Sequence, residues 1–388
     1  MKKKVLFVNP SLRQGGVEHS LITALNELDP SKYDVTLFLY ADMLDLLDLV
    51  PNYVNVIVGT DKTKYFRKPY VFCLWLLYEV LSRLRCRSTA KKIQKHMYDY
   101  IHTLKINNPY KKFFKGEKFD VAVSYSLHIG TEMTLNINAG RYCVFLHSSD
   151  PSYHYETAEK TFEKYDQIVC VSNGVKEVYK AVFEKYSDKM TVIENFVNAK
   201  KVIAKSTESL QINNRTELML CTCGRFSAEK GFDMAIESAY LLKQQGINFV
   251  WYFVGDGDER QKMEKLISKY SLKNDIVITG YVENPFPYVK ACDIYVQPSY
   301  QESFGLTIKE AVILNKTIVC TDTVGGRTVL GKGKYGETVP ISAEEIAKGI
   351  LTAQKKAQMG IYEKYDINQN EIEKKEYKNL LEQMLDRS

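Results

Sequence analysis

The stretch YQESFGLTIKE, residues 300–310, places two glutamates on either side of what reads as the start of a helix. A short apolar run with the composition of a buried strand, Ile294–Gln297, precedes it. A loop follows that strand, and a helical pattern then runs from Gly305 to Leu314. We therefore expect Glu302 on the loop and Glu310 in the second turn of the helix.

The same alternation of apolar runs and helical patterns continues along most of the chain. Continuous apolar strands separated by helices are typical of parallel sheets covered on both faces, so this is an α/β pattern. It occurs twice, and 388 residues are enough for two doubly wound domains. The predicted strands are Val5–Val8, Val35–Leu39, Val54–Val58, Val121–Ser124, Cys143–Leu146, Ile168–Val171, Leu218–Thr222, Phe249–Val254, Ile276–Thr279, Ile294–Gln297 and Thr317–Cys320.

Composition breaks divide the chain into three predicted parts. A polar stretch at 198–215 without a sustained period reads as a linker, so we expect domains at residues 1–200 and 201–360. The charged segment 361–388 is predicted to form a terminal helix that packs back on the N-terminal domain. Its apolar residues have helical spacing: Tyr377, Leu380, Leu381, Met384 and Leu385.

The overall composition indicates an ordinary soluble protein, with 45% hydrophobic and 26% charged residues. The apolar run in MKKKVLFVN is too short for a signal peptide. The eight cysteines are scattered, and the CxC at Cys221 and Cys223 has no second pair at zinc spacing. Buried free thiols in a reducing cytoplasm are the expected state.

The net charge of +6 is concentrated in one region. Lys62 to Lys118 holds fifteen Lys/Arg against three Asp/Glu, a local charge of +12. Within it, nine residues from Tyr70 to Tyr78 form an apolar block, far short of the roughly twenty that span a bilayer. The segment (residues 60–118) reads either as a buried helix with a solvated basic end or as a surface that faces anionic lipid. It contains no recognised nucleic-acid-binding motif.

Two further strand-to-helix turns are candidates for phosphate binding. The turn NPSLRQGGVEHSL, residues 9–21, has Gly15-Gly16 but lacks the GxGxxG spacing, which disfavours a dehydrogenase. The pair still allows close approach of backbone N–H groups to a ligand, although a simple turn explains it equally well. In CGRFSAEKGFDMAI, residues 223–236, Arg225 and Lys230 read either as a phosphate clamp or as solvated surface cations.

All three turns leave the carboxyl ends of predicted strands, where open α/β sheets bind their ligands. The helix that begins near Gly305 would direct free N–H groups at a diphosphate. An acid beside a phosphate site suits sugar or ribose hydroxyls, which donate hydrogen bonds to a carboxylate. Glu302 and Glu310 are therefore expected to bind polyols on either side of the diphosphate.

Together these residues resemble the family 4 glycosyltransferases, which are retaining enzymes of the GT-B fold. The resemblance covers nearly the whole chain and is strongest from 217 to 330. Its most specific element is the pair of glutamates with Phe304-Gly305 between them. The chain departs from many relatives at 195–198, where NFVN replaces Asn-Gly-Val-Asp. The matching motifs are Gly15-Gly16-Val17-Glu18, Arg225 with Lys230, Gly255-Asp256-Gly257, and Glu302 with Glu310.

The resemblance implies two Rossmann-like domains that face a central cleft, with the acceptor on the first and the nucleotide sugar on the second. It also implies a role for each matching residue. Glu310 would bind the donor ribose, and Glu302 the hydroxyls of the transferred sugar. Backbone amides of Phe304, Gly305 and Leu306 would bind the sugar and diphosphate, and Val282 would lie beside the nucleobase. His147, Arg225, Lys230 and Glu302 would be catalytic, and Gly15 and Gly16 would line the donor site.

The expected function is transfer of a hexose from a nucleoside diphosphate, without a metal or other cofactor. UDP is expected because it is the commonest nucleotide in such families, and GDP stays open. The expected acceptor is a glycan or a lipid-linked glycan in capsule, exopolysaccharide or cell-wall assembly. The enzyme would then be cytoplasmic, or peripheral on the inner face of the membrane, and would bind no nucleic acid. The alternatives are a GT-B sugar-nucleotide epimerase and a non-catalytic protein that binds nucleic acid or membrane through its basic surface.

Overall fold

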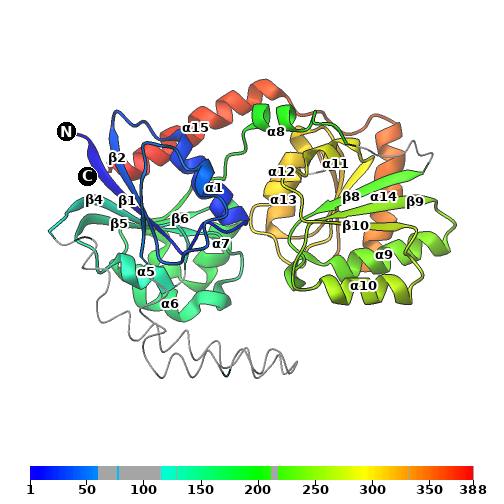
Figure 1. Cartoon of the computed structure of the whole chain (residues 1–388), viewed down its shortest axis with the longest axis horizontal. Coiled ribbons are helices and arrows are strands. Elements are labelled where there is room, and N and C mark those ends of the chain that lie inside the picture. The colour runs from blue at the N-terminus through cyan, green and yellow to red at the C-terminus, as the bar shows by residue number, and fades with distance from the viewer. Residues whose placement is uncertain are drawn as a thin grey trace. The chain divides into compact units, whose positions relative to one another are not determined.

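A computed structural model describes residues 1–59, 77, 114, 116–127, 129–210, 217–331 and 333–387. The chain forms two compact units (Figure 1). Unit 1 comprises Met1–Leu146, Ser152–Val169 and Met384–Ser388, and unit 2 comprises His147–Pro151 and Cys170–Gln383. The predicted domain boundaries at 200 and 360 stay predictions.

The first sheet has the strand order β3-β2-β1-β4-β5-β6-β7 among the described residues. Strand β1 pairs in parallel with β2 on one side and β4 on the other, so that Val5 lies opposite Val35 and Val121. Residues Val5–Val8 are fully buried, as a parallel strand covered on both faces requires. The strands are β1 (Lys3–Asn9), β2 (Tyr33–Leu39), β3 (Asn55–Val58), β4 (Phe119–Ser124), β5 (Ala139–Leu146), β6 (Gln167–Cys170) and β7 (Met190–Val192).

Helices and 3-10 turns lie between several of these strands in the described part of the chain. On one face of the sheet, Leu6 and Val8 of β1 pack with Phe38, Phe119 and Met133 in one apolar cluster. The described helices and 3-10 turns between the first and last strands of this sheet are α1 (Gly16–Glu27), η1 (Leu47–Leu49), α5 (Ile129–Thr134), η3 (Pro151–His154), α6 (Tyr155–Thr161), η4 (Phe162–Lys164), α7 (Asn173–Val182) and η5 (Glu184–Lys189), of which α7 and η5 belong to unit 2.

The second sheet, in unit 2, has the order β10-β9-β8-β11-β12-β13. All of its pairings are parallel, which confirms the predicted α/β pattern of this half. The fully buried Trp251 in β9 donates from its indole N–H to Thr222 Oγ1 in β8 at 3.0 Å. The strands are β8 (Leu218–Cys223), β9 (Phe249–Val254), β10 (Ile276–Gly280), β11 (Ile294–Gln297), β12 (Thr317–Thr321) and β13 (Gly336–Val339).

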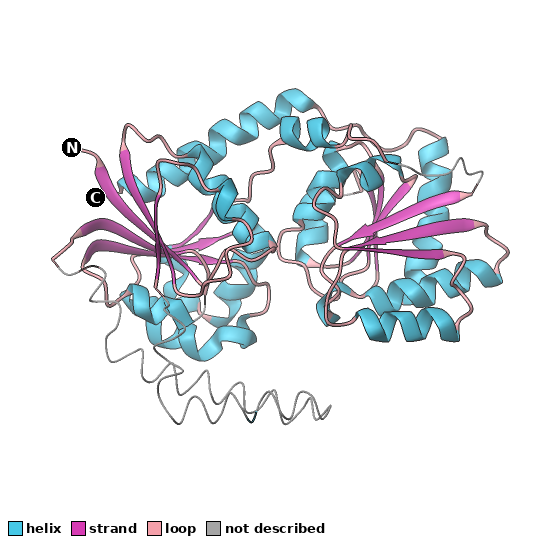
Figure 2. Ribbon diagram, viewed as in Figure 1, coloured by secondary structure: helices cyan, strands magenta, loops and turns pink. Residues whose placement is uncertain are grey.

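Helices cover both faces of this sheet (Figure 2). Alternate strand residues face the two layers, so Leu220 packs with the first layer and Cys221 with the second. The first layer is α9 (Phe232–Gln244), α10 (Arg260–Lys269) and α14 (Ala343–Gln358), and η6 (Ala228–Lys230) precedes α9. The second layer is α8 (Ala199–Lys205), α11 (Phe286–Ala291), α12 (Leu306–Ile313) and α13 (Val324–Leu330).

The predicted linker at 198–215 was wrong in part, because it contains helix α8. Asn198 caps this helix by accepting from Lys201 N at 3.1 Å, and Ala199 and Val202 are buried in the core of unit 2. The helix is too short for a periodic pattern to reveal it.

The predicted terminal helix is confirmed as α15 (Ile367–Asp386). Tyr377, Leu381 and Met384 are buried along it. The last residues belong to unit 1, where Lys3 Nζ donates to Leu385 O at 2.7 Å and Arg141 donates to Arg387 O at 2.7 Å.

Three other expectations concern cysteines, the basic segment and membrane spans. The six described cysteines are free and buried. The basic segment, residues 60–118, lies outside the described residues except for Leu77, Phe114 and residues 116–118. Within the described ranges, we find no helix with the length and hydropathy needed to cross a membrane.

Candidate functional site

The site lies in unit 2, where the strand order reverses direction. From β8 the chain proceeds outward to β9 and β10, then returns to β11 on the other side of β8. The loops after β8 and β11 therefore leave the carboxyl ends of neighbouring strands and diverge, and at such a topological switch point an open α/β sheet is expected to form a ligand-binding crevice. This confirms that the turn with Arg225 and Lys230 and the loop with Glu302 lie together.

Glycines bring these loops into backbone contact. Gly231 has φ +66°, and a Cβ there would lie 1.9 Å from Pro298 O in the loop after β11. A Cβ at Gly255, in the GDG turn after β9, would lie 1.9 Å from Gly224 O. Only glycine fits such contacts. The backbone of the β8 loop is therefore packed directly against both the GDG turn and the β11 loop.

Lys230 and Glu302 form an ion pair between the β8 and β11 loops. Lys230 Nζ lies 2.7 Å from Glu302 Oε2, and the two side chains are 24% and 14% exposed. Ser299 Oγ donates to the same carboxylate oxygen at 3.4 Å. Lys230 and Glu302 were predicted to bind different parts of a ligand, and the structure shows that they also pair with each other.

Arg225 lies exposed at the start of the β8 loop. Within the part of the chain that the structure describes, its guanidinium has no ion pair or side-chain hydrogen bond. Glu229 lies nearby. Burial raises the pKa of its carboxyl, but a hydrogen bond from Ser227 and the charges of Lys230 and Arg225 outweigh burial and lower it. Arg225 is therefore available to bind an anionic ligand.

The start of α12 supplies backbone donors to the same crevice. Gly305 occupies the N-cap position with φ +87°, and no side chain caps the helix. The first N–H groups of α12, which begins at Leu306, are thus left for solvent or a ligand. Phe304 is buried and anchors the loop just before the helix.

The sequence prediction missed Gly325 and Gly326 at the start of α13. A Cβ at Gly325 would lie 2.7 Å from Phe304 C and 2.9 Å from Gly305 N, and Gly325 N donates to Glu302 O at 2.7 Å. This glycine therefore shapes the loop that carries Glu302. A signal was present, because two glycines follow a strand here as Gly15 and Gly16 follow β1.

Glu310 lies one turn into α12 and is partly buried. Its carboxyl has no hydrogen-bond or ion-pair partner among the described residues, and burial raises its pKa to about 8. A desolvated carboxyl without a partner at a crevice is a candidate for ligand hydroxyls.

The remaining predicted site residues lie at strand ends. Val282 follows β10, and its side chain and that of Leu306 pack against the second-layer core of unit 2. His147 directly follows β5, while Gly15 and Gly16 follow β1 in unit 1. Their roles in donor binding and catalysis stay predictions.

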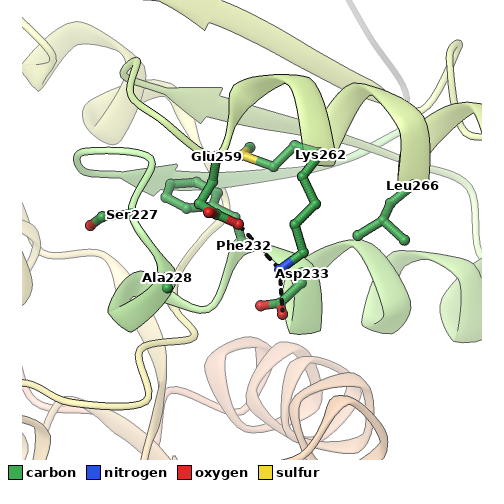
Figure 3. A pocket seen from close by; sticks show the side chains of 8 residues that line it. Ser227, Ala228, Phe232, Asp233, Glu259, Lys262 and Leu266 are labelled. Carbon is green, nitrogen blue, oxygen red and sulfur yellow. Dashed lines mark ion pairs between the residues drawn. The ribbon is translucent and has the colours of Figure 1, made fainter. Parts of the chain in front are cut away.

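A small pocket lies behind the β8 loop between α9 and α10 (Figure 3). Lys262 crosses it, with Nζ 3.1 Å from Glu259 Oε2 and 3.7 Å from Asp233 Oδ2. Its volume of about 10 Å³ holds no more than a single water, so it is not the site of a sugar. The described residues also include no cluster of three or more His, Cys, Asp or Glu side chains that could hold a metal ion.

Two family models match adjacent parts of the chain. One, described as "Glycosyltransferase Family 4", matches residues 14–201, and the other, "Glycosyl transferases group 1", matches residues 204–369. Together they include the loops with Gly15 and Gly16, with Arg225 and Lys230, and with Glu302.

Similar curated proteins have related descriptions. The lipopolysaccharide core biosynthesis glycosyltransferase LpsE of Rhizobium meliloti is 28% identical over 197 residues, which are 50% of this chain and 56% of that protein. The alpha-D-kanosaminyltransferase of Streptomyces kanamyceticus is 32% identical over 119 residues, 30% of this chain and 31% of that protein. The alignments thus span about half, or less, of these relatives.

Solved structures share the fold along the whole chain. HepE of Anabaena in complex with UDP superposes with a TM-score of 0.65 at 17% identity, covering 99% of this chain and 98% of that one. WaaG, described as a glycosyltransferase involved in lipopolysaccharide biosynthesis, gives a TM-score of 0.61 at 13% identity and covers 98% of both chains.

Proposed function

Because the chain belongs to the family 4 glycosyltransferases, we propose that it transfers a hexose from a nucleoside diphosphate to a hydroxyl group of a glycan or lipid-linked acceptor. The observation that carries this proposal is the meeting of two cations, a free helix N-terminus and two carboxyls at one switch point. Diphosphate and sugar hydroxyls are the ligand groups that such a set complements.

The proposal assigns each group a part of the donor. Arg225 and Lys230 bind the diphosphate, together with the backbone amides at Gly305 and Leu306. Glu302 accepts hydrogen bonds from the transferred sugar, and Glu310 accepts them from the ribose. Val282 packs beside the base, and Gly15 and Gly16 are also assigned to donor binding.

In the reaction, the bond between the anomeric carbon and the donor phosphate oxygen breaks, and a bond to the acceptor oxygen forms on the same face. The acceptor proton passes to the departing phosphate oxygen. Negative charge grows on the nucleoside diphosphate, where Arg225, Lys230 and the α12 N-terminus stabilise it. We propose that these groups suffice without a metal or other cofactor, and that His147 contacts the reacting sugar.

The donor and acceptor are proposed from the relatives. UDP is favoured over GDP because HepE was solved with UDP and with UDP-glucose. The description of LpsE favours a cell-surface polysaccharide or lipopolysaccharide as product. The basic segment of residues 60–118 would bring the enzyme to anionic lipid at the cytoplasmic face, at about 1 kcal/mol for each cation near the surface.

A transfer assay tests the proposal. Radiolabelled UDP-sugars are incubated with the protein and a lipid extract, presented in anionic or in neutral vesicles, with and without EDTA. We expect labelled glycolipid of retained anomeric configuration, a rate unchanged by EDTA, and faster transfer in anionic vesicles at low salt. Epimerised nucleotide sugar without transfer would establish the epimerase instead, and no turnover of any UDP- or GDP-sugar would contradict the proposal.

A further inference from the structure

A chain of buried polar side chains runs beneath the loop that carries Glu302. Tyr295 and Gln297 come from β11 and Ser299 from the loop after it, and these residues are 0%, 2% and 0% exposed. Buried polar side chains in native proteins are nearly always hydrogen-bonded, and each of these three side chains has a hydrogen-bond partner.

The hydrogen bonds of this buried network are consistent with one arrangement of donors and acceptors. Gln297 Oε1 accepts from Tyr295 OH at 2.7 Å and from Thr307 Oγ1 at 3.1 Å. The other end of the amide, Nε2, donates to Ser299 Oγ at 2.8 Å. Since Ser299 accepts there, its own proton is free to be donated to Glu302 Oε2 at 3.4 Å.

The backbone at both ends of this link is also held. Thr321 Oγ1, at the end of β12, donates to Ser299 O at 2.5 Å, and Gly325 N donates to Glu302 O at 2.7 Å. The carboxylate of Glu302 is therefore held by two donors, Ser299 Oγ and Lys230 Nζ. Thr307 extends the same network to the first turn of α12.

We propose that Ser299 and Gln297 are positioning residues for the donor sugar. They hold the Glu302 carboxylate in one orientation, so that its remaining lone pairs face the crevice and accept sugar hydroxyls. This inference rests on the proposed function, because it assumes that Glu302 binds the sugar. It adds that selectivity for a sugar nucleotide over the free nucleotide depends on a buried serine and glutamine that do not touch the donor.

A double-mutant cycle of Ser299→Ala and Glu302→Gln tests this. Calorimetry measures the Kd of UDP and of the UDP-sugar that the wild type binds most tightly. We expect Ser299→Ala to weaken UDP-sugar binding roughly tenfold and to leave UDP binding within about twofold. In the Glu302→Gln background, Ser299→Ala should have no further effect, because it acts through that carboxylate. Gln297→Met should weaken UDP-sugar binding as Ser299→Ala does.

Ser238→Ala is the matched control. Ser238 is also a fully buried serine of unit 2, and its hydroxyl donates to Met234 O and Ala343 O, remote from the crevice. It should lower the melting temperature as Ser299→Ala does without changing the ratio of the two Kd values. Equal weakening of UDP and UDP-sugar by Ser299→Ala, or additive effects in the cycle, would overturn the inference.

A ligand-free measurement separates this inference from the proposed function. In crystals of Ser299→Ala without donor, we expect the Glu302 carboxylate to leave Lys230 Nζ or to occupy more than one rotamer. An unchanged Glu302 would sink the inference while leaving donor binding intact. A wild type that binds neither UDP nor GDP would instead refute the proposed function.

Discussion

Replacing Lys230 with methionine is expected to lower kcat roughly a hundredfold to a thousandfold, because it removes one preorganised donor to the charge that grows on the leaving group. The effect on kcat should exceed the effect on KM, since that charge is largest in the transition state. Steady-state kinetics with the preferred UDP-sugar is the measurement.

The change also removes the cation beside Glu302, whose side chain is 14% exposed. Some loss of melting temperature is therefore expected from the unpaired carboxylate, and Lys230→Met/Glu302→Gln should recover it without recovering activity. Lys348→Met is the matched control, because Lys348 pairs with Glu345 at 2.6 Å on the exposed face of α14. A large loss of stability with normal turnover would show that Lys230 is structural.

Arg225→Ala should cost turnover to a similar degree. Here the melting temperature should not change, because the guanidinium is exposed and makes no ion pair among the described residues.

Glu310→Gln is expected to change the pH dependence of UDP binding. The pKa of Glu310 in the free protein is about 8, and an ionised carboxylate accepts two ribose hydroxyls where the protonated acid accepts less well. The affinity of the wild type for UDP should therefore rise as pH increases from about 7 to about 9. Charge-assisted hydrogen bonds of roughly 1.5–3 kcal/mol predict at least a tenfold advantage over Glu310→Gln at pH 9.

Near pH 6.5 the two proteins should bind UDP with similar affinity, because the wild-type acid is then protonated. The affinities of both proteins for UDP are measured by calorimetry at each pH. The ratio of the two affinities is independent of the titration of UDP itself, because that titration affects both proteins equally. Glu371→Gln, which alters a glutamate 58% exposed on α15, is the control. Identical pH profiles for wild type and Glu310→Gln would remove Glu310 from the donor site.

The same pKa has a consequence for stability without ligand. Burial raises the pKa of Glu310 from 4.5 to about 8, so the folded protein binds its proton more tightly than the unfolded chain does. The protonated Glu310 carboxyl therefore makes its full contribution to the free energy of unfolding below about pH 4.5. That contribution is lost as pH rises to about 8. Glu310→Gln lacks this loss and should melt at a higher temperature than the wild type at pH 8 to 9.

Most strands could be predicted because parallel strands buried on both faces are continuous apolar runs. No strand was predicted at β7 or β13, each of which lies at one edge of its sheet, whereas the opposite edge strands β3 and β10 were predicted. Met190–Val192 has only three residues, and Gly336–Val339 begins with a glycine and contains a glutamate. Such short strands carry too few apolar residues to be distinguished from loops.

The residues of the candidate site could be predicted where they lie within a single strand-to-helix turn, because the local sequence pattern then reveals them. Arg225, Lys230, Glu302 and Glu310 all follow buried strands, and parallel topology brings those strand ends together. The contact between Lys230 and Glu302 joins residues 72 positions apart, so spacing could not reveal it. Ser299 and Gln297 were overlooked for a similar reason, because their hydrogen bonds exist only once β11, α12 and the loop are packed.

The central claim is that the β8 and β11 loops of unit 2 bind a nucleoside diphosphate. Hydrogen–deuterium exchange of the wild type with and without UDP locates that site directly. We predict slower exchange in peptides covering residues 223–231 and 298–310, and no change in α10 or along α14. Saturable binding of UDP with protection only outside these two loops would contradict the claim.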